Sequence, residues 1–210
     1  MEVDDDQLSI LASLKKYDVF ISFNGEIRNN FFSHLCRAFN NIGIKIFFDD
    51  KIDRGEEISK ALFDAIDQSK FCLIIFSKNY ACSSWCLDEL VYILEKKQKK
   101  ELIVLPVFYY VEPSIVRRQK DTFETAFFNH EKCYNDTIIH NWRVALIKAA
   151  GLSGWDASKI RNDDELVNDI VNHIQAKLGS ASKQELDGID KASIGRLCGM
   201  GTSVKLGSKL

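Results

Sequence analysis

Short runs of hydrophobic residues alternate along this chain with stretches in which hydrophobic residues recur every three or four positions. The first pattern, when rich in β-branched and aromatic residues, is typical of buried strands, and the second is typical of helices that pack one face against a core. The runs predict strands at residues 17–23, 44–48, 71–76 and 101–109 and a short fifth strand at 152–156. The periodic stretches predict helices at 28–41, 58–68, 84–97, 138–150 and 165–178, with a less regular helical region at 114–130.

The alternation of strands and helices determines the fold class that we expect. Successive strand–helix–strand units favour right-handed crossovers and a parallel sheet covered by helices on both faces. Five such strands predict an α/β, flavodoxin-like three-layer fold with strand order 2-1-3-4-5, an order chosen partly by analogy with other sheets of this kind. Ligands bind in such folds where the order reverses, between the first and third strands. The loops at residues 24–28 and 77–84 are therefore the expected site.

The stretch from Ser77 to Leu90 carries the clearest candidate chemistry. Ser83 or Ser84 can cap the helix that begins there, because a serine oxygen accepts a hydrogen bond from a first-turn N–H group. Residues three and four apart are neighbours on a helix, so Trp85, Glu89 and Tyr92 share one stripe of its surface. An indole and a carboxylate are thus expected together at the carboxyl end of the third strand. An acidic residue early in a helix also favourably meets the helix dipole, so a structural role for Glu89 remains open.

Composition defines the expected domain organisation. The 210 residues, 46% of them hydrophobic, suffice for one sizeable core. Residues 1–14 form a polar, acidic leader, residues 15–178 one domain, and residues 179–210, rich in Gly, Ser and Lys, a predicted flexible tail. No apolar run approaches the roughly 20 residues of a membrane-spanning helix, and the acidic amino terminus is unlike a secretory leader. We therefore expect an intracellular protein.

Several functional classes are disfavoured by the sequence. A net charge of −2 argues against general electrostatic capture of nucleic acid, although a local basic patch remains open. The six cysteines include no Cys-x-x-Cys pair, and no His-Glu-x-x-His accompanies them, so we predict reduced thiols and no metal site. No Gly-x-Gly-x-x-Gly follows the first strand, which disfavours a dehydrogenase. A phospho-acceptor receiver domain would need acidic residues at the ends of the first and third strands, where this chain has Ser-Phe-Asn and Ser-Lys.

Four segments together resemble the ordered motifs of one family. They are Tyr-Asp-Val-Phe-Ile-Ser-Phe-Asn-Gly-Glu at 17–26, Arg-Gly-Glu-Glu-Ile at 54–58, Ser-Trp-Cys-Leu-Asp-Glu-Leu at 84–90 and Leu-Pro-Val-Phe-Tyr at 105–109. Over about residues 15–178 the chain resembles the Toll/interleukin-1 receptor (TIR) domain of plant intracellular immune receptors. The resemblance implies a flavodoxin-like fold, a cytoplasmic or nuclear location, and an NAD+ nucleosidase activity that requires self-association or association with other TIR domains.

The resemblance also implies a set of site residues. It assigns the catalytic glutamate to Glu89, whose carboxylate would engage the nicotinamide-side ribose as the glycosidic bond breaks. NAD+, or NADP+, is then a substrate, and no cofactor is required. The substrate-binding residues that it implies are Phe23, Asn24, Gly25, Glu26, Ile27 and Arg28 after the first strand, Arg54, Gly55 and Glu57 in the following polar loop, and Ser83 and Trp85 before the glutamate. Neighbouring subunits would complete the pocket by fixing the polar loop.

Three positions depart from the family pattern. Asn24 stands where plant members usually have arginine, the segment Gly25–Arg28 is one residue shorter than usual, and residues 110–113 replace an Asp-rich turn. The lost positive charge near the pyrophosphate predicts weaker NAD+ binding, by about 1.5–3 kcal/mol for one charged partner. Two alternative functions follow: a non-catalytic TIR adaptor that only oligomerises, and a synthetase that makes cyclic nucleotides from nucleic acid.

Overall fold

The computed structural model of this protein describes residues 15–48 and 58–198. The chain divides into two compact units, Met1–Val171 and Asn172–Leu210. The sheet and the candidate site belong to the first unit.

A five-stranded parallel sheet forms the centre of the first unit. Its strands follow the order β2-β1-β3-β4-β5, and every neighbouring pair is parallel. The predicted fold class and strand order are therefore confirmed. The strands are β1 (Tyr17–Phe23), β2 (Ile46–Phe47), β3 (Ser69–Phe76), β4 (Ile103–Phe108) and β5 (Trp155–Asp156).

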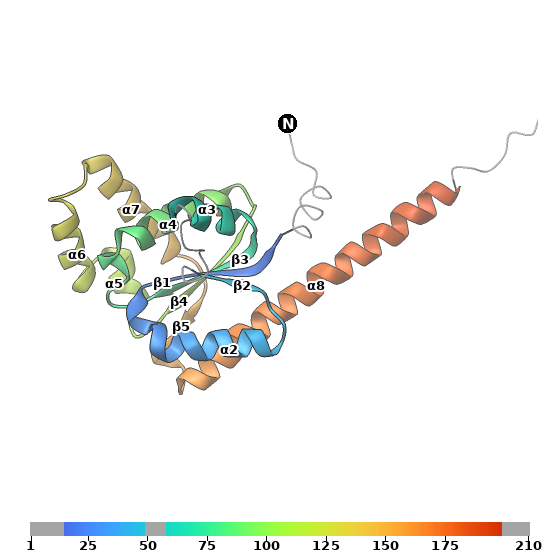
Figure 1. The fold of residues 1–210 in the computed structure, drawn as a ribbon, viewed down its shortest axis with the longest axis horizontal. Helices are drawn as coiled ribbons and strands as arrows, with labels where there is room; N and C mark the ends of the chain where they lie inside the picture. Colours follow the sequence, from blue (N-terminus) through green and yellow to red (C-terminus); the bar gives the residue numbers. More distant parts are fainter. Residues whose placement is uncertain (1–14, 49–57, 199–210) are drawn as a thin grey trace, which may run out of the picture. The chain divides into compact units, whose positions relative to one another are not determined.

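Helices cover both faces of the sheet, as the alternating pattern predicted. In Figure 1, α2 lies on one face and α3 and α4 lie on the other, with α5, α6 and α7 gathered at one end of the sheet and α7 against α4. The α-helices of the first unit are α2 (Ser33–Asn41), α3 (Ile58–Asp67), α4 (Ser84–Gln98), α5 (Pro113–Arg118), α6 (Thr122–His130) and α7 (Asp136–Ala149), together with the start of α8 (Asp163–Cys198). Short 3-10 turns form at η1 (Gly25–Ile27), η4 (Tyr80–Cys82) and η5 (Ala157–Lys159), and one π-helical turn forms at η2 (Arg28–Phe32).

Burial of the central strands explains their sequences. Five consecutive residues of β1, from Val19 to Phe23, are buried, and so are all residues of β3 from Phe71 to Phe76. A strand covered on both faces reads as a continuous hydrophobic run, which is the pattern of both segments. Ser22 is the polar exception in the buried part of β1. The outer strands β2 and β5 have two residues each, fewer than the predicted segments 44–48 and 152–156.

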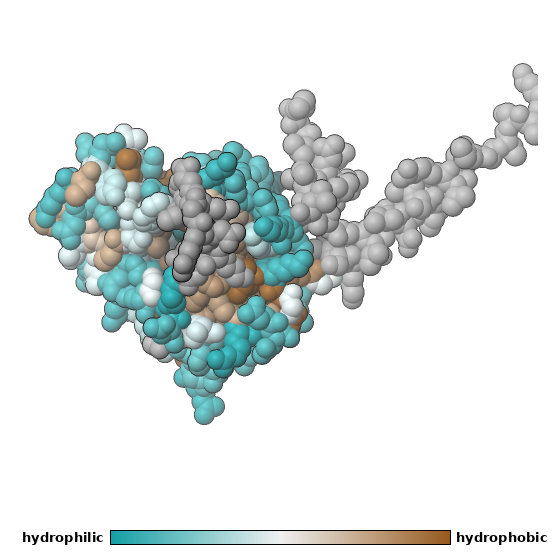
Figure 2. All heavy atoms as spheres, in the orientation of Figure 1, coloured by the Kyte–Doolittle hydropathy of each residue, from teal (hydrophilic) through white to brown (hydrophobic). Residues whose placement is uncertain are grey.

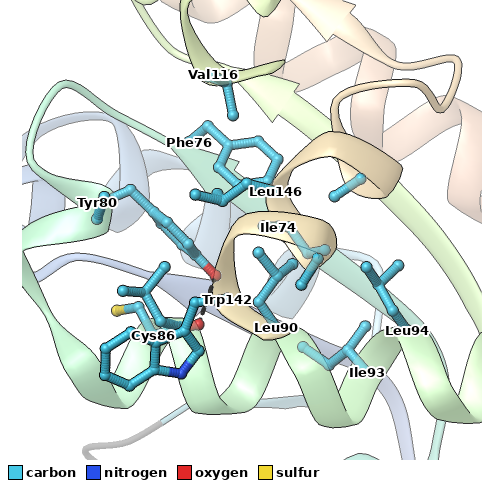
Figure 3. Packing of buried hydrophobic residues seen from close by; sticks show 14 of the residues in the cluster. Ile74, Phe76, Tyr80, Cys86, Leu90, Ile93, Leu94, Val116, Trp142 and Leu146 are labelled. Atoms are coloured by element: carbon cyan, nitrogen blue, oxygen red, sulfur yellow. Dashed lines mark hydrogen bonds between the residues drawn. The ribbon is translucent and has the colours of Figure 1, made fainter. Parts of the chain in front are cut away.

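The core beneath α4 fixes the position of this helix on the sheet. Figure 3 shows side chains of β3, η4, α4 and α7 packed into one cluster, with Trp142 of α7 beside α4. The rings of Phe76 and Tyr80 meet edge to face with their centroids 4.8 Å apart. Each large apolar side chain buried in this way contributes roughly 1.5–3 kcal/mol. The cluster therefore holds the start of α4 firmly against the carboxyl end of the sheet.

The last helix differs from the sequence prediction. We expected a helix at 165–178 and a flexible tail after it, but α8 runs from Asp163 to Cys198. The predicted end at residue 178 is therefore wrong. Residues 179–198 contain no proline and several good helix formers, and their glycines lower helix stability without breaking the hydrogen-bond ladder. The domain boundaries themselves stay a prediction.

The described residues on the face shown in Figure 2 are mostly hydrophilic, with hydrophobic residues in smaller groups. Within residues 15–48 and 58–198, no helix combines the length and the hydrophobicity that crossing a bilayer would require.

Candidate active site

A cavity of about 290 Å³ opens at the carboxyl end of β1, beside the first turns of α4. It occupies the place that the strand order predicted, because β1 and β3 are neighbours in the sheet. Five of the residues that the sequence assigned to the site line it together, and three lining residues were not expected. The lining residues are Phe23, Gly25, Ser83, Trp85 and Glu89, and the unexpected ones are Ile21, Leu62 and Cys86.

The start of α4 is built by a serine cap. Ser83 has extended backbone geometry, and its Oγ accepts a hydrogen bond from the backbone N–H of Cys86 at 3.3 Å. Of the two caps that the sequence left open, Ser83 is therefore the one used. The cap places Trp85 and Glu89 one turn apart on the side of α4 that borders the cavity.

Glu89 is the buried acidic group of the cavity. Its side chain is only 8% exposed, and its Oε2 accepts a hydrogen bond from the hydroxyl of Ser22 at 2.8 Å. Carboxylates are almost never buried to this extent without a partner, because removal from water disfavours the charged form. The location of Glu89 at a cavity wall therefore needs the polar contact that β1 supplies.

Trp85 forms the exposed wall next to this carboxylate. Its indole is 51% exposed, while Leu62 and Ile21 contribute apolar surface to the same cavity. Apolar walls exclude water and lower the local dielectric, so a charge here acts more strongly on a bound group than it would in solvent. The arrangement suits a ligand with a flat aromatic part and a part that develops positive charge.

A second, larger cavity of about 530 Å³ adjoins the first. The two share Leu62, Trp85 and Glu89 as lining residues. The larger one lies between α3, α4 and α7, where Phe63 and Tyr92 form part of its wall. Glu89 and Trp85 thus border both spaces.

Two loops are joined next to the smaller cavity. Asn24 caps η1 by accepting a hydrogen bond from the Glu26 backbone N–H at 3.2 Å, and its amide donates to the Asn79 carbonyl at 3.0 Å. The Glu26 carboxylate in turn accepts from the Asn79 backbone N–H at 3.3 Å and from the Asn79 side-chain amide. The residue that replaces the family's arginine therefore links the loop after β1 to the loop after β3.

The other residues assigned to the loop after β1 have different surroundings. The Arg28 guanidinium lies 5.1 Å from the centre of the Phe23 ring, which places a positive charge beside a cavity-lining residue. The Ile27 side chain is buried and is not one of the residues that line the cavity. Arg54, Gly55 and Glu57 lie outside the described residues.

Sequence reasoning missed two polar residues behind Glu89. Ser22 interrupts the hydrophobic run of β1, and Tyr80 follows β3 in η4. Both side chains are almost completely buried. A single hydroxyl residue inside an otherwise apolar strand was the signal that could have identified Ser22, because a buried polar group requires a partner.

Metal binding has no support in the described part of the chain. No group of three or more His, Cys, Asp or Glu residues there is arranged to hold an ion. The described cysteines are free thiols, namely Cys36, Cys72, Cys82, Cys86 and Cys133.

Comparison with known proteins identifies the family. The TIR domain family model matches residues 16–192. The chain is 45% identical over 182 residues to TMV resistance protein N of Nicotiana glutinosa, covering 85% of this chain and 16% of that protein. It is also 45% identical over 163 residues to disease resistance protein RPV1 of Vitis rotundifolia, covering 77% of this chain and 12% of that protein. It therefore spans less than a fifth of the length of these relatives.

A solved structure agrees with these matches. The TIR domains in the structure of the activated Roq1 resistosome, which directly recognises the pathogen effector XopQ, superpose with a TM-score of 0.71 at 44% sequence identity. The alignment covers 76% of this chain and 99% of that one. From its motifs, its fold and these relatives, the chain belongs to the TIR domain family, in the form found in plant disease resistance proteins.

Proposed function

We propose that this TIR domain is an NAD+ hydrolase that cleaves the bond between nicotinamide and ribose when it self-associates, and that its products act as plant immune and cell-death signals. The observation that carries the proposal is the position of Glu89, a buried carboxylate at the wall of a cavity between the ends of β1 and α4. The family membership supports the same reading, since the resemblance assigns the catalytic role to this residue.

The chemistry follows from the charge that develops as the glycosidic bond breaks. The sugar carbon becomes electron-poor while nicotinamide leaves, and a carboxylate fixed beside it stabilises that charge. Trp85 offers an exposed aromatic face against which a flat ring can stack. Water or another acceptor then completes the reaction, so NAD+ is consumed as a substrate and no cofactor is needed.

The size of the cavity favours a nucleoside-sized part of the substrate. A volume of about 290 Å³ lies at the low end of small-molecule sites, so the remainder of a dinucleotide would extend beyond it. The loop after β1 borders the opening, and Arg28 supplies a cation near Phe23 that can attract a pyrophosphate. In our proposal, Arg54, Gly55 and Glu57, which lie outside the described residues, also bind the substrate.

Nicotinamide release from clustered protein tests this function. We would incubate purified chain with NAD+ at high concentration and on a surface that crowds it, and compare wild type with Glu89→Gln. The substitution keeps the shape of the side chain but removes its charge, so release should fall at least about 100-fold, as for other lost electrostatic contacts in the transition state. The matched control is Glu124→Gln, which alters an exposed glutamate of α6 and should leave the rate unchanged.

The non-catalytic adaptor is the second candidate, and Asn24 favours it. This neutral side chain is already engaged with Asn79, so it offers the pyrophosphate no charge. Clustered wild-type protein that binds other TIR domains but releases no nicotinamide would support the adaptor and contradict the enzyme. Equal release by wild type and Glu89→Gln would also contradict the proposed role of Glu89.

A further inference from the structure

Two buried hydroxyl groups lie behind the Glu89 carboxylate. Ser22 is 1% exposed and Tyr80 is completely buried, and they come from β1 and η4. The Ser22 hydroxyl donates to Glu89 Oε2 at 2.8 Å and lies 3.0 Å from the Tyr80 hydroxyl. The Tyr80 hydroxyl also donates to the backbone carbonyl of Cys86 at 3.1 Å, the contact drawn in Figure 3. The four residues therefore form a continuous polar chain inside the core.

The number of available protons determines which group donates and which accepts in this series of hydrogen bonds. An ionised carboxylate can only accept, so the single hydroxyl proton of Ser22 is committed to Glu89. The contact between Ser22 and Tyr80 then requires Tyr80 to be the donor, with its proton shared between the serine oxygen and the Cys86 carbonyl. The Ser22 hydroxyl therefore points toward the carboxylate and is itself supported by the shared Tyr80 proton, an arrangement that favours the ionised form of Glu89 and fixes its rotamer.

We propose that Ser22 and Tyr80 are positioning residues that hold the Glu89 carboxylate ionised and oriented toward the cavity. The kinetic consequence rests on the proposed NAD+ hydrolase function, whereas the electrostatic consequence does not. Neither residue lines the cavity, so both act through Glu89 and not on the substrate.

Tyr80 is suited to remain a donor at every physiological pH. Burial, followed by the nearby Cys86 and Glu89 side chains, raises the pKa of its phenol well above the ordinary value, against a smaller opposite effect of the hydrogen bond to Ser22. Its ring is held against Phe76, and its hydroxyl reaches the carbonyl of the residue three positions before Glu89. One side chain thus connects η4, β1 and the first turn of α4.

Other titratable groups lie near Glu89 and could also contribute to the pH dependence of the rate. In β3, burial and then the charge of Glu89 raise the pKa of the Cys72 thiol, so this group stays neutral near pH 7. On α4, Cys86 shares the smaller cavity, while Asp88 and Tyr92 share the larger one. Ser22 contacts the carboxylate directly, and Tyr80 contacts it through the Ser22 hydroxyl.

The kinetic test uses two variants that each remove one hydroxyl. Ser22→Ala should lower kcat about 10- to 100-fold with little change in KM, because a hydrogen bond to a charged group is lost and no substrate contact changes. The acidic limb of its pH–rate profile should move to higher pH, since the carboxylate loses a donor that favours ionisation. Tyr80→Phe should produce smaller changes in the same directions, and Ser22→Cys, which retains a weak donor, should recover part of the loss.

Ser69→Ala is the matched control. Ser69 is also a completely buried strand serine that donates one hydrogen bond, at 2.7 Å to the Ala65 carbonyl, but it lies at the opposite end of β3 from the site. Its loss of stability should resemble that of Ser22→Ala, while its kcat and pH profile should match wild type. Equal kinetic losses in the two variants would overturn the proposal, because they would trace the effect to general destabilisation.

A second measurement separates this inference from the proposed enzymatic activity. The chain is labelled with 13C at glutamate carboxyl carbons, and the Glu89 signal, assigned by its absence in Glu89→Gln, is followed through an acid titration by NMR. Its midpoint should rise in Ser22→Ala and, less, in Tyr80→Phe, whether or not the protein turns over NAD+. Identical midpoints in wild type and Ser22→Ala would overturn the inference, whereas a shifted midpoint without nicotinamide release would contradict only the enzyme proposal.

Discussion

The indole nitrogen of Trp142 donates a hydrogen bond of 2.8 Å to the carboxylate of Asp88. This contact joins α7 to the exposed side of α4, one residue before Glu89, across 54 positions of sequence. Trp142 itself is 1% exposed, and the larger cavity lies against both residues. The helix that carries the candidate catalytic group is thus held from its outer side as well as through the core beneath it.

Substitution of Trp142 tests how much this contact stabilises the domain. Trp142→Phe removes the donor and part of a buried ring, so the free energy of unfolding should fall by about 2–3 kcal/mol. Chemical denaturation with a circular dichroism readout measures the change. Asp88→Asn keeps an oxygen acceptor at the same position and should cost less than about 1 kcal/mol. A Trp142→Phe protein as stable as wild type would show that the α4–α7 contact is dispensable.

Removing the hydroxyl of Ser77, the buried serine directly after β3, should not lower the free energy of unfolding. The Ser77 hydroxyl is buried and has no hydrogen-bond partner within the described residues. Ser77→Ala should therefore leave the free energy of unfolding unchanged or raise it by up to about 1 kcal/mol, since an unsatisfied buried group is removed. Ser69→Ala, which loses a made hydrogen bond, should instead lower it by about 1–2 kcal/mol. Thermal unfolding of both variants side by side decides the comparison, and a clear loss in Ser77→Ala would contradict it.

Replacing Asn24 by the arginine that is usual in plant members should strengthen NAD+ binding under the proposed function and lower the stability of the domain. Asn24→Arg restores a cation at the opening, so KM for NAD+ should fall about 10-fold, in line with one charged hydrogen bond to a phosphate. It also removes the cap on the Glu26 N–H and the link to Asn79, so the free energy of unfolding should fall by about 1 kcal/mol. Steady-state kinetics and denaturation measure the two effects. Asn24→Gln adds no charge and should not lower KM; a similar fall in both variants would refute the electrostatic explanation.

Gly154 permits the close approach of the chain before β5 to β4. A Cβ atom at this position would collide with the Pro106 carbonyl, which is backbone and cannot move aside cheaply. Gly154→Ala should therefore lower the free energy of unfolding by about 2–3 kcal/mol. Gly179→Ala is the control for the added Cβ, because a Cβ there meets no atom within 4 Å and alanine in α8 should keep or slightly raise the free energy of unfolding. Equal midpoints of thermal unfolding for the two variants would show that the backbone at Pro106 moves aside for the added Cβ without loss of stability.

Asp156 predicts a dependence of stability on acid pH. Burial works against its ionisation, but hydrogen bonds from Ser158 and Lys159 together lower its pKa below the ordinary value of 3.8. A carboxyl group with a lowered folded-state pKa stabilises the protein above its unfolded pKa, and this contribution is lost as pH falls through the folded value. Asp156→Asn should therefore destabilise the domain at pH 7, with the difference from wild type shrinking below about pH 4. Denaturation midpoints across this range measure the effect, and a constant difference would contradict it.

Local sequence determined much of the fold of this protein. The largely apolar runs placed β1 and β3, and two adjacent serines, Ser83 and Ser84, marked the start of α4, because burial pattern and helix capping are properties of neighbouring residues. Five alternating strands, with analogy to other sheets of this kind, predicted the strand order, and the motif resemblance added the catalytic role of Glu89. The end of α8 was not predictable from hydrophobic periodicity, since that segment lacks a regular apolar stripe and is still helical.

Only the tertiary structure decided what surrounds the glutamate. Ser22 and Glu89 are 67 positions apart, and Asn24 and Asn79 are 55 apart, yet each pair is within hydrogen-bonding distance. Periodicity in the sequence states which face of an element is buried, but not which atoms of another element meet it there. These contacts arise because parallel pairing brings the ends of β1 and β3 together and packs α4 over them. The sequence thus determined the candidate catalytic group, and the packing of distant elements determined its hydrogen-bond partners and its access to the cavity.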